Sequence, residues 1–175
     1  MKLVIADKKR LAKVKELYIS AFPRVEQKPF PILRFNQKRG ITNIFSIEDN
    51  DEFCGLAMTI EYKDRVLLIY FAIVEDKRGT GIGTKALQLL LEKYKDKRFY
   101  LEIESTKVPC GNFEARKKRK RFYLKNGLTE LDFGVNLFSV DMEIMTNGKS
   151  LSFEEYKELY LKGFSRLISH KIKRI

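Results

Sequence analysis

The sequence predicts an α+β fold in which helices flank a mixed, mostly antiparallel sheet, with one additional helix at the C-terminal end. Segments with the apolar pattern of strands and segments with helical period follow one another in the order β-α-α-β-β-β-α-β-α-β-β, and a helix comes last. Two strand segments, 41–47 and 52–62, are separated by a short polar turn, which indicates a hairpin. The 175 residues show no repeat and no low-complexity linker, so we expect a single domain over 1–175.

Prolines and turns separate the elements in the first half of the chain. Apolar residues between Leu11 and Ala21 recur on one helical face, and Pro23 ends that helix because proline lacks a backbone N–H. Two further prolines, Pro29 and Pro31, predict a loop followed by a short helix. The expected elements are a strand at Met1–Ala6, helices at Lys8–Phe22 and up to Arg39, strands at Ile41–Ile47 and Glu52–Tyr62, and a buried strand at Val66–Val74.

Capping residues mark the helices of the second half. Asn112 is expected to cap one helix, and Gly127 follows the end of that helix. Ser152 and Glu155 have the spacing of a capping box at the start of the last helix. The expected elements are a helix from Thr84, a strand at Arg98–Glu104, a helix from Asn112 to Asn126, strands at Leu128–Val135 and Leu137–Met145, the last helix, and a basic, frayed tail at His170–Ile175.

Composition narrows the classes of function. The formal net charge of +12 favours anionic partners, such as a phosphate-bearing cofactor, an acidic substrate or a nucleic acid, without choosing among them. No apolar run approaches the ~18 residues of a membrane span, so we expect no membrane association. Cys54 and Cys110 make no disulfide framework, and free thiols in a reducing cytoplasm are the simplest account. The single histidine, His170, argues against histidine triads and zinc sites.

The stretch from Leu67 to Tyr94 organises the rest of the chain. A buried strand leads into the charged turn Glu75–Arg78, then the glycine-rich loop Gly79–Gly83, and then a helix from Thr84. Glycines let a ligand approach the backbone closely, and the first N–H groups of a helix have no internal partners. Together with the helix dipole and a basic residue at the turn, these features predict an anion-binding site.

The spacing of the glycines decides what kind of anion-binding loop this is. Glycines at 79, 81 and 83 fit neither a P-loop nor the G-x-G-x-x-G dinucleotide fingerprint. Arg78, Gly81 and Gly83 instead closely resemble the Arg/Gln-x-x-Gly-x-Gly/Ala pyrophosphate loop of the GNAT superfamily of N-acetyltransferases. The segment RFYLKNG, at 121–127, resembles a second motif of that family, and the order of elements resembles its layout over Met1–Met145.

The resemblance implies an enzyme that transfers an acetyl group from acetyl-CoA to a primary amine by direct attack in a ternary complex, with no metal. The side chains of Phe71, Ala72 and Ile73, in the strand before the loop, are equally typical of a hydrophobic core. A core role for these side chains is compatible with a donor-binding role for their backbone groups. Neither the acceptor nor the oligomeric state follows from a readable motif, and a homodimer is among the states that the sequence allows. The donor-binding residues implied are Arg78, the backbone of Gly79, Thr80, Gly81, Ile82, Gly83 and Thr84, and the backbone of Phe71, Ala72 and Ile73.

Three further residues are candidates for the chemistry. Tyr123, within RFYLKNG, matches the family's tyrosine that protonates the departing CoA sulfur, although tyrosine is also typical of a helix–sheet contact. Glu104, at the end of a strand, is a candidate general base or substrate anchor, or else a surface acid. Glu26, in the proline-rich loop, is a candidate for the base or for binding the amine, with a surface role as the alternative. Arg116 replaces an asparagine that contacts CoA in many members, so that contact is lost or replaced.

Two other classes of function stay open. A CoA-binding sensor or interaction module without turnover would share the loop but would not need Tyr123 or Glu104. The run RKKRKR at 116–121 suggests a nucleic-acid- or ribosome-associated protein, but such runs occur widely in proteins that bind no nucleic acid. For this run we favour solvated side chains and one or two contacts with the CoA 3′-phosphate. Cys110 is a poor nucleophile candidate because no histidine is near it in the sequence.

Overall fold

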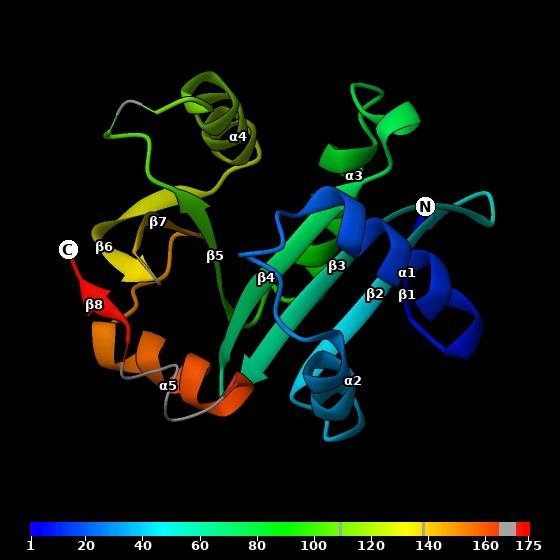
Figure 1. Cartoon of the computed structure of the whole chain (residues 1–175), viewed down its shortest axis with the longest axis horizontal. Helices are drawn as coiled ribbons and strands as arrows, with labels where there is room; N and C mark the ends of the chain where they lie inside the picture. The colour runs from blue at the N-terminus through cyan, green and yellow to red at the C-terminus, as the bar shows by residue number, and fades with distance from the viewer. Residues whose placement is uncertain (109, 138, 165–170) are drawn as a thin grey trace. The chain divides into compact units, whose positions relative to one another are not determined.

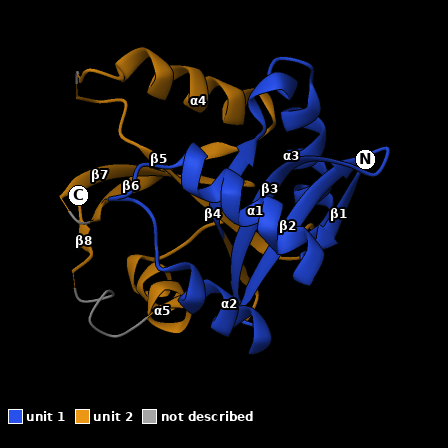
Figure 2. Cartoon of the chain, turned by 45° about the vertical axis from the view of Figure 1, so that its right-hand side comes forward, with its two compact units in different colours: residues 1–61, 68–94 blue, residues 62–67, 95–175 orange. Residues whose placement is uncertain are grey.

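The computed structural model describes residues 1–108, 110–137, 139–164 and 171–175. Over these residues the helices and strands follow the predicted order, so the expected α+β fold with a mostly antiparallel sheet and flanking helices is confirmed. The chain divides into two compact units, one of residues 1–61 and 68–94 and the other of residues 62–67 and 95–175 (Figure 2). The single-domain organisation stays a prediction.

The first unit is a helix-covered sheet with the strand order β1-β2-β3-β4. In Figure 1, α1 lies in front of these strands and α3 lies behind them. α1 and α2 pack against β2, and α3 packs against β1. Both β1 with β2 and β2 with β3 are antiparallel pairs. The elements are β1 (Lys2–Ile5), α1 (Lys8–Ala21), α2 (Phe30–Lys38), β2 (Thr42–Asp49), β3 (Glu52–Tyr62), β4 (Arg65–Ile73) and α3 (Ile82–Lys93).

Caps and prolines set the helix boundaries of this unit. The Asp7 carboxylate accepts hydrogen bonds from the N–H groups of Lys9 at 3.1 Å and Arg10 at 3.0 Å, so α1 begins directly after it. α2 begins at Phe30 and carries Pro31 in its first turn, where no intrahelical N–H is required. The core beneath the helices consists of fully buried apolar side chains: Val14, Leu33, Ile44, Ile47, Leu56, Met58 and Leu90.

The second unit has the strand order β5-β7-β6-β8, and the pairs between neighbours are antiparallel. Ser152 and Glu155 form the predicted capping box of the last helix, with a bond of 3.2 Å from the Glu155 N–H to Ser152 Oγ and one of 3.0 Å from the Ser152 N–H to the Glu155 carboxylate. α4 packs against β5. The elements are β5 (Arg98–Glu104), α4 (Phe113–Lys125), β6 (Thr129–Leu137), β7 (Val140–Thr146), α5 (Phe153–Gly163) and β8 (Lys173–Arg174).

The prediction of a frayed tail is wrong for residues 171–175. Lys173–Arg174 forms β8 on β6, and Gly134 and Ile175 exchange backbone hydrogen bonds of 3.1 and 3.0 Å. The outer edge of β6 has unpaired N–H and C=O groups, and an extended segment of the same chain satisfies them. His170, the first residue of the expected tail, lies outside the described residues.

Two helix starts also differ from the prediction. α3 begins at Ile82, two residues before Thr84, because Gly81 takes the left-handed backbone, with φ 85°, that serves as its N-cap. Asn112 precedes α4, but its side chain makes no capping hydrogen bond. Its Oδ1 accepts from the Cys110 thiol at 3.0 Å instead, so the capping oxygen is already engaged.

Candidate functional site

The glycine loop between β4 and α3 exposes a row of backbone N–H groups that have no partner among the described residues. A short 3₁₀ turn, Glu75–Lys77, leads from β4 into the loop. Gly79 and Gly81 have φ values of 79° and 85°, and a Cβ added at either would meet no atom within 4 Å. The N–H groups of Gly79–Thr84 make no hydrogen bond with a described residue, and the last three of them open α3. This geometry fits a diphosphate, because free N–H groups and the positive end of a helix dipole both attract an anion.

Arg78, at the entrance to the loop, folds back onto the end of β4. Its Nε donates to the carbonyl of Ile73 at 3.1 Å. Thr80 Oγ1 donates to the carbonyl of Lys77 at 2.7 Å and tightens the same turn. Phe71, Ala72 and Ile73 are half-buried at the end of the strand. The Ile73 carbonyl, one of the backbone groups expected to face the donor, is therefore engaged by Arg78 here.

Gly55 of β3 lets the neighbouring strand approach at this point. A Cβ at Gly55 would lie 2.3 Å from the carbonyl oxygen of Ala72, which is far inside van der Waals contact. Beside it, the Val74 N–H donates to the carbonyl of Cys54 at 3.0 Å. Gly55 thus fixes the end of β4, and sequence reasoning missed it. The available signal was an isolated glycine inside a strand pattern, which often marks close backbone approach.

Tyr70 of β4 anchors the proline-rich loop that carries Glu26. Its hydroxyl donates to the Glu26 carbonyl at 2.7 Å and accepts from the Lys28 N–H at 3.0 Å. The Tyr18 ring of α1 meets the Tyr70 ring edge-on, with 4.7 Å between centroids, and its hydroxyl donates to the Lys28 carbonyl at 2.9 Å. The exposed Glu26 is thereby held beside the strand that precedes the glycine loop. Sequence reasoning missed Tyr70, which no motif marks.

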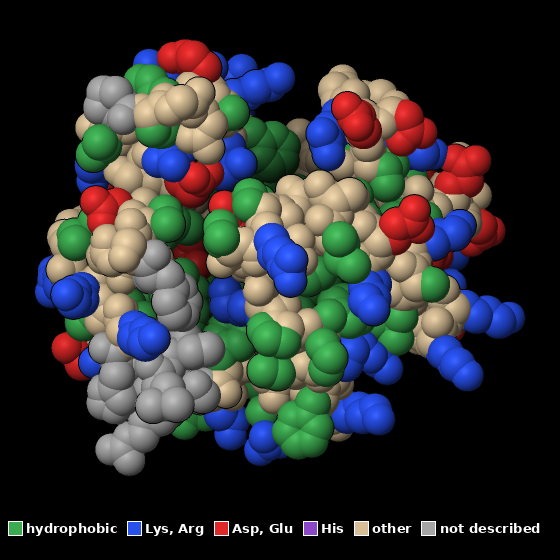
Figure 3. Space-filling model, in the orientation of Figure 1, with side chains coloured by type: hydrophobic (Ala, Val, Ile, Leu, Met, Phe, Trp, Pro, Cys, Tyr) green, Lys and Arg blue, Asp and Glu red, His purple; other side chains and the backbone are tan. Residues whose placement is uncertain are grey.

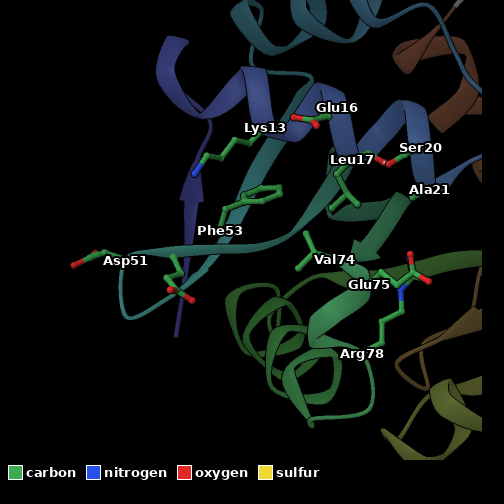
Figure 4. A pocket seen from close by; sticks show the side chains of 11 residues that line it. Lys13, Glu16, Leu17, Ser20, Ala21, Asp51, Phe53, Val74, Glu75 and Arg78 are labelled. Atoms are coloured by element: carbon green, nitrogen blue, oxygen red, sulfur yellow. The ribbon is translucent and has the colours of Figure 1, made fainter.

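A groove of about 800 Å³ on the first unit ends at Arg78 (Figure 4). Its apolar lining comes from Leu17 of α1, Phe53 of β3 and Val74. Glu26 is not among the residues that line it. The charged side chains around it include two carboxylates that are already paired, Asp51 with Lys2 at 2.6 Å and Glu52 with Lys77. The remaining lining residues are Lys13, Glu16, Ser20, Ala21, Glu75 and Arg78.

Tyr123 lies on the buried side of α4 in the second unit. The residue is 7% exposed, and its ring meets the Phe122 ring edge-on with 5.2 Å between centroids. Burial raises the pKa of Tyr123 to about 12, and the nearby Arg119 acts in the opposite direction. The phenol is therefore protonated at neutral pH and holds a proton that it can donate.

Glu104, at the end of β5, is held between two arginines of α4. Arg116 Nη2 lies 2.6 Å from its Oε1, and Arg119 Nη1 lies 3.1 Å from its Oε2. Arg116 also donates to the carbonyl of Ser105 at 3.2 Å. The Glu104 side chain is only 13% exposed, which excludes the surface-acid interpretation. Both carboxylate oxygens of Glu104 therefore already accept a charge-assisted hydrogen bond from a guanidinium.

The basic run of α4 is divided between paired and unpaired side chains. Arg116, Arg119 and Lys120 bind carboxylates on the strands of the second unit. Lys118 and Arg121 are exposed, and neither forms an ion pair with a described residue. On the face seen in Figure 3, basic side chains are interspersed with acidic ones. Half of the run is thus part of the internal structure of this unit.

The described part of the chain contains no cluster of three or more His, Cys, Asp or Glu side chains arranged to hold a metal ion. None of its helices combines the length and the apolar character that crossing a membrane requires. Cys54 is buried and Cys110 is exposed, and both are free thiols.

Comparison with known proteins adds independent information. The family model described as the acetyltransferase (GNAT) family matches residues 11–127. A Bacteroides thetaiotaomicron protein assigned to the GNAT acetyltransferases aligns in structure with a TM-score of 0.76 and 20% identity, over 97% of this chain and 99% of that one. The ribosomal-protein-S18-alanine N-acetyltransferase of Escherichia coli aligns with a TM-score of 0.64 and 17% identity, over 86% and 95%. Arabidopsis thaliana Naa50, in complex with the bisubstrate analogue CoA-Ac-MVNAL, aligns with a TM-score of 0.63 and 20% identity, over 86% and 98%. A search of curated proteins finds no match.

The chain belongs to the acetyltransferase (GNAT) family, because the family model covers well over half of it, including the glycine loop and the RFYLKNG segment. It is therefore an acetyl-CoA-dependent acyltransferase, and the predicted family, fold class and acyl donor are confirmed. The solved structures share too little sequence with this chain to show more than the fold.

Proposed function

We propose that the protein is an N-acetyltransferase that transfers the acetyl group of acetyl-CoA to a primary amine by direct attack in a ternary complex. The observation that carries this proposal is the row of unpartnered N–H groups along Gly79–Thr84, at the start of α3, in a chain of this family. Binding the diphosphate there fixes one end of the donor, so the thioester is presented in a restricted set of positions.

Arg78 and the backbone of Gly79–Thr84 hold the pyrophosphate, and the backbone of Phe71–Ile73 holds the pantetheine arm and the acyl carbonyl. The support for Arg78 is its position at the entrance of the loop, where its guanidinium is exposed. Because Gly79 and Gly81 have no Cβ, the phosphate oxygens can come close to the backbone at these positions. Among these strand residues, the Ile73 carbonyl must first be released by Arg78 before it can meet the donor.

Tyr123 acts as the general acid of the reaction. The neutral amine attacks the thioester carbonyl carbon, the C–S bond breaks, and the sulfur takes the phenolic proton of Tyr123 as it leaves. The proton given up by the amine passes to a base or to solvent. The phenol stays protonated over the whole neutral range, so it holds a proton when the sulfur leaves.

Glu26 and Glu104 have different parts in this proposal. Glu26 lies on an exposed loop held by Tyr70, so its carboxylate is the better candidate for meeting a cationic amine and taking its proton. Glu104 accepts hydrogen bonds from two guanidiniums, which favours a role as an anchor over a role as the base.

The acceptor in this proposal is an amine, and the structural neighbours that are named as N-acetyltransferases support that class of acceptor. One is an acetyltransferase of a ribosomal-protein alanine, and another is an aminoglycoside 6'-N-acetyltransferase complexed with coenzyme A. We place the enzyme in the cytoplasm because its two cysteines are free thiols.

The proposal is tested by acetyl-CoA binding and by thiol release with a panel of primary amines. At a hundredfold excess over Kd, acetyl-CoA should stabilise the protein by about 2.7 kcal/mol, which thermal unfolding measures. At least one amine should then release CoA at a rate that depends on its neutral fraction. No thermal shift at millimolar acetyl-CoA would reject donor binding, and binding without turnover on any amine would indicate a sensor.

A further inference from the structure

Two arginines and the proposed general acid share one face of α4. Arg116, Arg119 and Tyr123 follow one another at intervals of three and four residues, the spacing that places side chains side by side on a helix. Glu104 of β5 binds both guanidiniums, at 2.6 and 3.1 Å. These bonds join two elements, so they fix the positions of the guanidinium groups beside the tyrosine.

The charges of this group do not cancel. Glu104 carries one negative charge against the two positive charges of Arg116 and Arg119, which leaves a formal net charge of +1. Arg116 is the more enclosed partner, with 17% of its side chain exposed and its buried Nε unpaired, whereas 47% of the Arg119 side chain is exposed. The neighbouring ion cluster is balanced, with two lysines against two glutamates: Lys107, Lys120, Glu130 and Glu143.

We propose that Arg119, held in place by Glu104, is a positioning residue whose positive charge stabilises the Tyr123 phenolate formed when the phenol gives its proton to the departing CoA sulfur. This rests on the proposed function. As the C–S bond breaks, the sulfur takes the bonding electron pair and the phenolic proton, and solvent returns to the phenolate the proton that the amine released. A cation one helical turn away stabilises the phenolate and leaves the neutral phenol unaffected.

The burial of Tyr123 explains why such a charge is useful. Removing a phenol from water penalises its ionised form, which makes it a weaker acid toward a thiolate. Burial alone therefore protects the proton but opposes its transfer. The pKa of Tyr123 is about 12, with burial as the raising cause and Arg119 as the lowering one. Arg119 offsets part of the cost of burial, and its ion pair with Glu104 restrains a side chain that is 47% exposed.

The first test measures Tyr123 directly, with no need for turnover. A fluorinated tyrosine, whose phenol ionises at lower pH, is placed at position 123 and titrated by fluorine NMR in the range where the protein stays folded. Arg119→Met should raise the midpoint by about one pH unit, and Arg119→Lys should leave it within a few tenths of the parent value. Lys118→Met, on an exposed and unpaired neighbour, is the matched control and should not move it.

The second test measures catalysis in the full chain. Arg119→Met should lower kcat about tenfold and move the alkaline limb of its pH profile upward, with little change in KM for acetyl-CoA. Arg119→Lys should restore most of kcat. Arg119→Gln, which also lacks the charge but keeps a polar side chain, should move kcat and the fluorine midpoint in the same direction as Arg119→Met, and it keeps the assay informative if Arg119→Met folds poorly.

An unchanged midpoint and kcat in Arg119→Met would overturn the inference. If Tyr123→Phe loses turnover while Arg119→Met behaves as the parent protein, only the inference fails. Full turnover in Tyr123→Phe would reject the acid role itself, and the inference falls with that part of the proposed function.

Discussion

Comparing two glycines, one inside the proposed donor loop and one outside it, separates the effect of a substitution on ligand binding from its effect on backbone strain. Gly81, at the start of α3, and Gly148, in the turn after β7, have φ values of 85° and 86°, and a Cβ at either would meet no atom within 4 Å. Alanine in this conformation costs about 1–2 kcal/mol at either position. The two sites therefore share the same strain, and only one of them lies in the proposed donor loop.

We predict that Gly81→Ala weakens acetyl-CoA binding at least tenfold, because the new Cβ occupies the space into which the phosphate oxygens must move. Gly81→Ala and Gly148→Ala should lower the free energy of unfolding by similar amounts. Gly148→Ala should leave the acetyl-CoA Kd unchanged. Calorimetric titration gives the Kd values, and denaturant unfolding gives the stabilities. Equal affinity in the two variants would contradict the assignment of the loop.

A second residue-scale prediction concerns the hydroxyl of Tyr123. Tyr123→Phe should lower kcat about 100-fold with less than about a threefold change in KM for acetyl-CoA, because it removes only the proton donor. Thiol release measures both constants. Tyr160→Phe is the comparison: its hydroxyl donates to the two Glu102 oxygens at 2.8 and 2.7 Å, so it should lose stability with no specific effect on kcat. A parent-like kcat in Tyr123→Phe would favour a CoA-binding module that needs no acid.

Elements were predictable from the sequence wherever a local signal defines them. The strand at Arg98–Glu104 was predicted with its exact bounds, as was the capping box at Ser152. The glycine loop was predicted from the order of strand, basic turn, glycines and helix, and from the resemblance of Arg78, Gly81 and Gly83 to the family's pyrophosphate motif. β8 was missed because its pairing with β6 joins residues nearly forty positions apart, and no local pattern reports that.

The candidate site was less readable than the fold for the same reason. Tyr123 and Glu104 stand out in their own segments, but the two arginines between which Glu104 lies belong to another element. Gly55 and Tyr70 act through contacts with a loop or strand distant in sequence. The roles of these residues depend on contacts with residues distant in the sequence, and a single sequence does not show which distant residues are in contact.

α5, the additional helix, is fastened to the second unit by charged groups. Arg65, 1% exposed, donates to the Glu155 carbonyl at 2.8 Å and to the Glu158 carboxylate at 2.6 Å. Arg98 donates to the Glu155 carboxylate at 2.7 Å and to Asp64 at 2.7 Å. The attachment of this helix should therefore respond to pH.

We predict that stability falls on acidification through Glu155. Its hydrogen bond with Arg98 lowers the pKa of Glu155 from 4.5 to about 2. Because the folded pKa is depressed, the stabilisation is complete above about pH 5 and is lost as the pH falls toward 2. Glu155→Gln should lower Tm by about 2–5 °C at pH 7 and show a smaller difference from the parent protein near pH 2. Glu154→Gln, exposed in the same first turn, is the control and should behave as the parent at both pH values.

Over the whole molecule, the net charge of +12 is a poor guide to function, because it does not show which Lys and Arg side chains are paired with carboxylates and which are exposed. The basic run of α4 illustrates this. Arg116, Arg119 and Lys120 bind carboxylates, so they cannot also neutralise phosphates without breaking those pairs. Lys118, Arg121 and Lys125, at intervals of three and four residues, form an exposed stripe with no ion pair to a described residue.

The number of exposed cations in this stripe sets the salt dependence that we expect for any binding of nucleic acid. Three phosphate contacts give a salt dependence with a slope near −2.7, so affinity for duplex DNA should fall about 40-fold between 50 and 200 mM salt. Replacing Lys118, Arg121 and Lys125 by glutamine should remove most of the slope. Fluorescence anisotropy with a labelled duplex, over a series of salt concentrations, measures the affinity for DNA and its salt dependence. Tight binding that persists at 200 mM salt would contradict this account, because it requires contacts beyond the three exposed cations, and it would move the protein toward the nucleic-acid class.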